Sequence, residues 1–179
     1  MAVVISVVIL VVFTSTLIAL LHQARLVAQH SAYTVNLKGM HVAMYRYSVG
    51  NNGSYPTHIG MLLADGSLTP EYLTITNYRT SLPEYPGDTP PSPMYRYGDY
   101  FFTYTGLDAN ASPEHILAFS MPLETDLIHV MFADGQVSSL TYEELQAAIT
   151  RSNELRSQED PPIPSIEIPS DITNIVNQH

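Results

Sequence analysis

Cysteine and tryptophan are both absent from this 179-residue chain. Without cysteine the protein forms neither a disulfide bond nor a thiolate metal site. Charge is missing from one end of the sequence, since no charged side chain precedes Arg25 and no acidic one precedes Asp65. What remains before Arg25 is a run of apolar, small and uncharged polar residues.

The rest of the chain is strongly acidic. The net charge is -10, and all 17 acidic residues lie after position 64, together with only four of the seven lysines and arginines. A surface of this sign repels phosphate backbones. The composition therefore excludes nucleic acid as an expected partner.

Residues 1–24 predict a membrane-type helix. A helix of this length spans roughly 30–36 Å, enough for the hydrocarbon core of a bilayer. A cleaved signal peptide is the alternative, but no basic residue precedes the apolar run. We expect the segment to be retained and to act as a polymerisation helix. Its candidate contact residues are Val4, Val8, Val11, Val12, Leu17, Leu20 and Leu21.

The helical pattern continues beyond the apolar run. One face, expected to pack on a core, carries Leu26, Tyr33, Leu37, Met40, Met44 and Tyr47; a second seam, spaced by sevens, carries Ala28, Val35, Val42 and Val49. The exit signals are Gly50, Asn52, Gly53 and Pro56. The sequence thus predicts one helix over residues 1–50, about 75 Å long.

Residues 51–156 predict an α/β head. A short helix is expected from Ile59 and is closed by Asp65-Gly66; strand-like residues 72–76 and an irregular proline-rich loop, 81–94, follow. Three β-type runs then occupy 100–105, 115–121 and 127–133. The expected fold class is α+β, with a long N-terminal helix, a small antiparallel sheet and an extended tail.

Two local motifs refine the head. Asp134-Gly135 separates two β-type runs and predicts a hairpin with a primed turn, in which both central residues have positive φ. Thr141 and Glu144 form a capping-box pattern that starts a helix expected to reach Leu155. The twelve tyrosines suggest an exposed surface.

Residues 157–179 are rich in proline and acidic side chains and predict an extended tail outside the packed head. Two interpretations are open. The tail is disordered, or its isoleucines form a strap that pairs with a neighbouring subunit by strand addition.

Candidate chemistry is sparse. The seven histidines show no metal-ligand spacing with a carboxylate, and for His115 and His129, which lie in expected strands, we expect a structural role. Loop carboxylates Asp108, Asp126 and Asp134 are candidate Ca²⁺ ligands, and no other cofactor is expected. No catalytic constellation occurs, so the sequence predicts that the protein is not an enzyme.

Two stretches resemble a known family. Residues 23–57, QARLVAQHSAYTVNLKGMHVAMYRYSVGNNGSYPT, are similar to the post-anchor helix and helix exit of type IV pilin-like proteins, especially the major pseudopilins of type II secretion. Residues 129–145, HVMFADGQVSSLTYEEL, resemble the closing hairpin of planctomycete pilin-like proteins of the H-X9-DG type. Glu124 stands where that family has its histidine, and neither Ala2 nor Ile5 supplies the family's N-terminal glutamate.

The resemblance implies a structural subunit of a pilus-like filament or secretion pseudopilus, built by bundling of the N-terminal helices. Its expected partners are other copies of itself, the inner membrane before assembly and the assembly machinery. Its expected location is a cell-surface or extracellular filament, or the periplasm, reached through the inner membrane. The alternative is a single-pass membrane-anchored binding protein, whose recognition patch would contain Tyr95, Tyr97, Tyr100 and Tyr104.

Overall fold

The computed structural model describes residues 2–74, 94–104, 106–122, 127–159, 162–170 and 172–173. The chain divides into two compact units, Met1–Ala32 and Tyr33–His179. Helix α1 (Ala2–Gly50) supplies the whole of the first unit and the first element of the second. The α+β fold class and the long N-terminal helix predicted from the sequence are confirmed.

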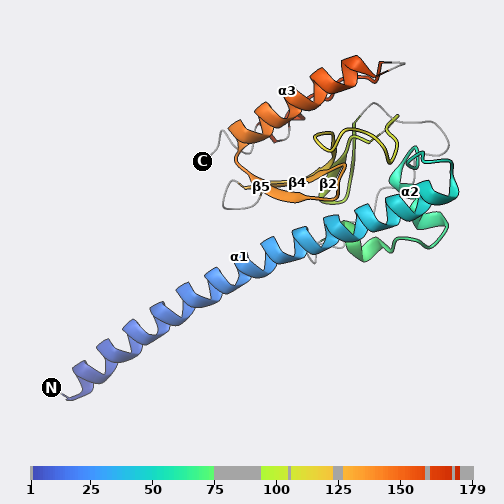
Figure 1. Cartoon of the computed structure of the whole chain (residues 1–179). Coiled ribbons are helices and arrows are strands. Elements are labelled where there is room, and N and C mark those ends of the chain that lie inside the picture. The colour runs from blue at the N-terminus through green and yellow to red at the C-terminus, as the bar shows by residue number, and fades with distance from the viewer. Residues whose placement is uncertain are drawn as a thin grey trace. The chain divides into compact units, whose positions relative to one another are not determined.

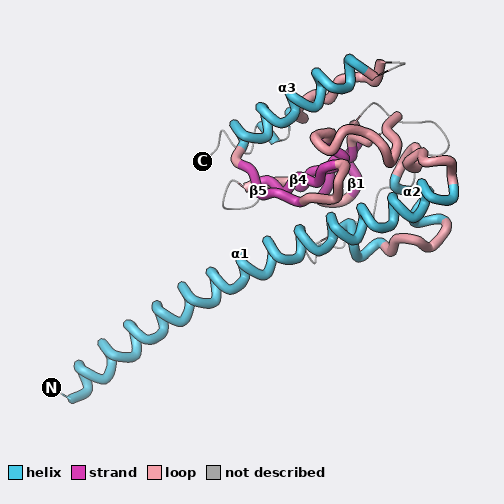
Figure 2. Tube along the Cα trace, viewed as in Figure 1, coloured by secondary structure: helices cyan, strands magenta, loops and turns pink. Residues whose placement is uncertain are grey.

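The second unit is built around one antiparallel sheet with strand order β1-β2-β3-β4-β5. The strands are β1 (Tyr95–Tyr97), β2 (Tyr100–Phe102), β3 (Ile116–Ser120), β4 (Ile128–Phe132) and β5 (Val137–Leu140). Around it lie α2 (Ile59–Ala64), the 3-10 helix η1 (Pro70–Leu73) and α3 (Tyr142–Gln158). Every strand pairs with its sequence neighbour, so the sheet is a meander (Figures 1 and 2).

Side-chain alternation along the strands divides the core into two clusters. Tyr100 and Phe102 face one cluster while Phe101, between them, faces the other. The first cluster contains the helix α1 side chains Tyr33, Leu37, Met40, Ala43 and Met44. The second contains Leu145 and Ile149 of α3. Within the second unit, the sheet is therefore the middle layer between the part of α1 that begins at Tyr33 and α3, as Figure 1 shows.

Strand β3 departs from strict alternation. The pairing of β3 with β4 shifts register between Ile116 and Ala118. Consecutive residues Leu117 and Ala118 consequently belong to the same cluster as α1.

Two expectations are corrected by the structure, and one strand was not expected. Tyr72 and Leu73, expected in a strand, lie in the 3-10 helix η1, which begins at Pro70. Strand β1 was not anticipated; it pairs with β2 across Gly98 and Asp99. The expected exposed tyrosine surface is wrong for Tyr33, Tyr55, Tyr97, Tyr100 and Tyr104, which are all buried, whereas Tyr45 and Tyr72 are exposed. The expected loop at 81–94 lies outside the described residues except for Met94.

The tail does not lie apart from the head. Residues 162–170 have no regular secondary structure, yet Ile166 is only 3% exposed and Ile172 is fully buried in the second cluster. Helix α3 also continues beyond Leu155 to Gln158. The described part of the tail packs against its own chain, so the disordered interpretation does not describe it. Strand addition to a neighbouring subunit stays a prediction, because the structure contains one chain.

Candidate functional site

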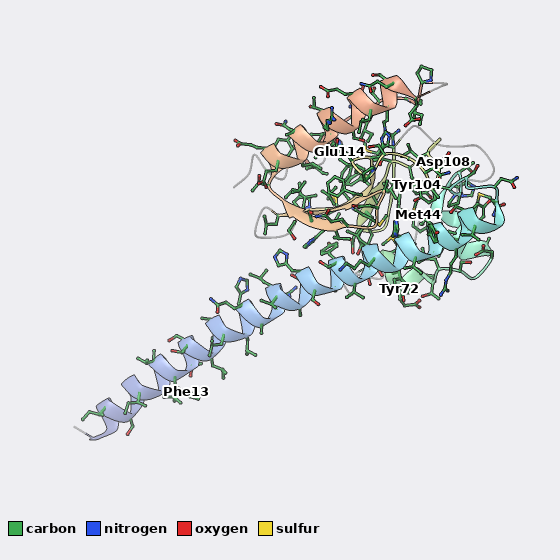
Figure 3. All side chains as sticks on the ribbon, viewed as in Figure 1. Phe13, Met44, Tyr72, Tyr104, Asp108 and Glu114 are labelled. Carbon is green, nitrogen blue, oxygen red and sulfur yellow. The ribbon has the colours of Figure 1, made fainter. Side chains whose placement is uncertain are left out.

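The first unit presents an apolar surface. Among the described polymerisation-helix residues, Val11, Val12, Leu17, Leu20 and Leu21 are each between 46% and 62% exposed, and Phe13 is 67% exposed (Figure 3). The side chains of Val4 and Val8 lie outside the described ones. Helix α1 is long and apolar enough to cross a membrane. A signal sequence near the N-terminus can have the same length and composition. This exposed surface is the strongest candidate functional site.

The hydroxyl groups within this segment are satisfied by their own helix. Thr14 Oγ1 donates to the Leu10 carbonyl at 2.7 Å, Ser15 Oγ to Val11 at 2.9 Å and Thr16 Oγ1 to Val12 at 2.8 Å. Such back-bonding removes the cost of placing a hydroxyl in an apolar medium. These three small side chains therefore suit lipid or a closely packed neighbouring helix.

In the second unit, α1 has one covered and one uncovered apolar face. The covered face is the predicted core face, on which Tyr33, Leu37, Met40 and Met44 are at most 3% exposed. The second seam is uncovered, with Val35, Val42 and Val49 between 48% and 71% exposed. Lys38 and Arg46 are also exposed on this part of the helix.

The helix exit has the geometry that its residues predict. Asn52 and Gly53 have φ of 56° and 85°, and Gly53 N–H donates to the Ser48 carbonyl at 2.9 Å. Together these features form a Schellman cap with Asn52 in the left-handed position. Gly50 is the last helical residue and Pro56 is buried just beyond the cap.

The Asp134-Gly135 hairpin is confirmed, but its predicted turn type is wrong. Gly135 has φ of 81°, whereas Asp134 does not have positive φ. Gly135 N–H donates to the Phe132 carbonyl at 3.0 Å, and Asp134 Oδ1 accepts from Gln136 N–H at 2.8 Å. The loop is a type I turn followed by a left-handed glycine, which is the usual three-residue solution.

This turn lies against helix α1. His41 Nε2 is 3.1 Å from the Ala133 carbonyl oxygen. A Cβ atom on Gly135 would lie 2.7 Å from the His41 ring. Glycine is therefore required at this position both for its backbone conformation and for the close approach of the helix.

The candidate Ca²⁺ ligands are not brought together. Asp108 Oδ1 accepts from Asn110 N–H at 2.7 Å, and Asp134 serves its own turn. Asp126 lies outside the described residues. In the part of the chain that the structure describes, no three histidine or acidic side chains are grouped so as to hold a metal ion.

The two strand-region histidines have separate partners. His129 Nδ1 is 2.9 Å from Ser139 Oγ, and its ring stacks on Tyr33 with centroids 5.4 Å apart. His115 is fully buried, and its Nε2 lies 3.2 Å from Glu159 Oε1. Both positions match the structural role expected from the sequence.

His115 makes the stability of the head dependent on pH. Burial lowers its pKa, with a further contribution from Arg156 and opposition from Glu159. In the unfolded chain the histidine pKa has its ordinary value of about 6.5. Between about pH 6.5 and the lowered pKa of the folded state, the unfolded chain therefore binds more protons than the folded chain. The contribution of His115 to stability is complete above about pH 6.5 and falls as the pH decreases below it. Thermal unfolding at about pH 8 and pH 5.5 should show a larger loss for the wild type than for His115→Gln. Equal losses would contradict this assignment.

The capping box at α3 is confirmed. Thr141 Oγ1 accepts from Glu144 N–H at 3.4 Å, and Glu144 Oε2 accepts from Thr141 N–H at 2.8 Å.

Thr141→Ala should lower the free energy of unfolding by about 1 kcal/mol because it leaves the Glu144 N–H without its side-chain acceptor. Chemical denaturation measures this loss, and Thr150→Ala, on the exposed side of the same helix, is the control. A T141A variant as stable as T150A would show that the cap contributes nothing.

Arg156 is a buried cation that sequence patterns did not single out. It is fully buried, its Nη1 donates to the Pro164 carbonyl at 3.0 Å, and its Nη2 donates to the Thr103 carbonyl. Burial lowers its pKa to about 10, which still leaves it charged at neutral pH. It holds the tail and the end of the sheet to α3. Its position within the helix gave no signal, since arginine on an amphipathic helix is usually solvated.

The tyrosine patch proposed for a binding protein is not present as expected. Tyr97, Tyr100 and Tyr104 are at most 7% exposed, and the side chain of Tyr95 lies outside the described ones. Burial raises the pKa of both Tyr97 and Tyr100. Of these residues, Tyr97 lines a groove of about 770 Å³ together with Tyr47, Gly60, Met61, Leu63, Ala64 and Asp65. It carries no catalytic arrangement among these residues.

The chain matches no protein-family model, no curated protein and no solved structure.

Proposed function

We propose that this protein is a membrane-anchored structural subunit that assembles with other copies through its N-terminal helix, as a pilus-like filament or a secretion pseudopilus. The observation that supports the proposal is the exposed apolar surface of α1 before Arg25, continuous with a helix that forms part of the head's core. Burying one face of such a segment removes about 800–1,000 Å² from water, worth on the order of 20 kcal/mol. A surface of this size requires lipid or protein around it.

The same helix serves both stages of the proposed assembly. In a bilayer its apolar side chains face lipid, and association must come from packing and small-residue contacts. In a filament the helices of neighbouring copies replace the lipid. The back-bonded hydroxyls of Thr14, Ser15 and Thr16 leave no unpaired hydroxyl donor in either setting.

The acidic heads would lie on the outside of the assembly. Their negative charge opposes close packing, and we expect association to strengthen as salt screens that repulsion. On this proposal the protein is found at the inner membrane before assembly and in a periplasmic or surface structure afterwards, and it has no catalytic role.

Cysteine cross-linking in membranes tests the proposal, because the natural chain contains no cysteine. Phe13→Cys, at a 67% exposed apolar position, should give covalent dimers on mild oxidation. Asn110→Cys, in an exposed loop of the head, is the control for random collision. If F13C yields no more dimer than N110C, the helix does not mediate association, and a monomeric membrane-anchored binding protein becomes the better description.

A further inference from the structure

The tail is held by α3 in the manner of a bound peptide. Ile166 and Ile172 enter the second core cluster beside Leu145 and Ile149. These two isoleucines are the apolar anchors of the described residues 162–170 and 172–173, here called the tail segment. It packs against residues of α3 and of the sheet in the second core cluster, and the surface that it covers is here called the tail cleft.

The Asn153 side chain binds both backbone polar groups of Ile166. Asn153 Nδ2 donates to the Ile166 carbonyl at 2.9 Å, and Asn153 Oδ1 accepts from Ile166 N–H at 2.7 Å. This pair satisfies both polar groups of one residue, as a neighbouring strand would. Because the contact is to the backbone, it selects an extended conformation.

Arg156 adds two further backbone contacts. Its carbonyl accepts from Ile163 N–H at 3.0 Å, and its Nη1 donates to the Pro164 carbonyl at 3.0 Å. The same guanidinium is fixed from the other side by the Thr103 carbonyl. The Arg156 guanidinium is therefore also held by a residue outside the tail segment.

Backbone hydrogen bonds combined with pockets for separated apolar side chains are the usual means of recognising extended peptides. Pro162, Pro164 and Pro169 stiffen the tail segment, which reduces the entropy lost on docking. We propose that the tail cleft is a recognition site for an extended, isoleucine-bearing peptide, occupied here by the chain's own tail segment, and that the tail segment of a second copy also binds there.

A second copy is the occupant that fits because its tail segment carries both apolar anchors and the same backbone groups. Any contact made within one chain can be made between two identical chains. Such an exchange would join heads directly, a linkage separate from the N-terminal helix. Copies held close together would favour it by raising the local concentration of tails.

A peptide-binding experiment tests the tail cleft on the full chain in detergent. The host carries Ile166→Asp and Ile172→Asp, which release its own tail, and the probe is a fluorescent peptide of residues 162–173. We expect saturable binding to this host and much weaker binding to the wild type, whose cleft is filled. Absence of binding to a host with a native-like near-UV spectrum would overturn the proposal.

Matched variants identify the contacts. Asn153→Ala in the host should weaken peptide binding by about tenfold or more, because two hydrogen bonds are lost. Gln146→Ala, an exposed amide on the same helix, should leave it unchanged. A peptide with Ile166→Asp should not bind, whereas one with the exposed Glu167→Gln should bind normally. Equal binding of the two peptides would overturn the proposed recognition.

Cross-linking keeps the proposal testable if that host does not fold. Tyr142 Oη and Thr173 Oγ1 are 3.1 Å apart within the chain. Full chains carrying Tyr142→Cys and others carrying Thr173→Cys are mixed and treated with a short bifunctional maleimide. Exchange predicts a mixed dimer that disappears when the T173C chain also carries Ile166→Asp. No mixed dimer, or one unaffected by I166D, would show that the tail stays on its own chain.

Discussion

The double substitution Val11→Arg and Leu17→Arg should prevent stable insertion of the protein into membranes. Both side chains are exposed on the apolar segment, at 62% and 46%. An arginine near the centre of a membrane helix costs about 2.5–3.5 kcal/mol on insertion scales. Two such residues therefore lower the equilibrium constant for insertion by about four to five orders of magnitude. Flotation of the expressed chains with membrane vesicles measures the effect.

The control for this substitution lies on the same helix. Val49 is 71% exposed in the second unit, close to the end of α1. Val49→Arg adds an arginine outside the apolar segment and should leave flotation unchanged. If the V11R/L17R chain floats as efficiently as V49R, the segment before Arg25 is not the membrane anchor.

Gly98→Ala should strongly destabilise the head. Gly98 has φ of 63°, and a Cβ atom at this position would lie 2.1 Å from the Leu73 carbonyl oxygen. That carbonyl accepts from Asp99 N–H at 3.0 Å, so backbone must move and a buried hydrogen bond is strained. We expect a loss of about 3 kcal/mol or more in the free energy of unfolding.

Denaturant titration followed by near-UV circular dichroism of the tyrosines measures this loss, since the chain has no tryptophan. Gly50→Ala is the matched control: Gly50 is helical, and a Cβ there meets nothing within 4 Å. Alanine at that position should be neutral or stabilise by up to about 1 kcal/mol. Similar midpoints for G98A and G50A would contradict the close approach of Gly98 to Leu73.

The sequence predicted those elements whose signals are local. The helix end at Gly50, the hairpin at Asp134-Gly135 and the cap at Thr141 each depend on a few adjacent residues with defined backbone or hydrogen-bonding preferences. The core face of α1 was also predictable, because Leu37, Met40 and Met44 follow the helical period.

What the sequence failed to predict depends on contacts between distant segments. Arg156 is buried because two carbonyls from other parts of the chain receive its guanidinium. The tail is ordered by Asn153, an amide with no distinguishing sequence context. The turn at Asp134 took the three-residue form, in which only the glycine needs positive φ. Strand β1 has only three residues and gave too short a signal.

Within the candidate site, composition identified the apolar segment but not its surroundings. Hydropathy and length indicate a helix suited to a membrane, and the exposed side chains of α1 agree with that prediction. Whether those side chains meet lipid or other copies depends on molecules outside the chain. The expected Ca²⁺ site, in contrast, was not predicted correctly from the sequence. Asp108 and Asp134 each accept a hydrogen bond within their own turn and do not form a common site.

Electron microscopy of the full-length protein before and after detergent removal tests the central claim most directly. The account predicts that removing detergent produces filaments with residues 2–24 of every copy along the central axis, and that a chain lacking these residues forms none. Strictly monomeric particles under both conditions, or filaments formed equally well by the shortened chain, would contradict it.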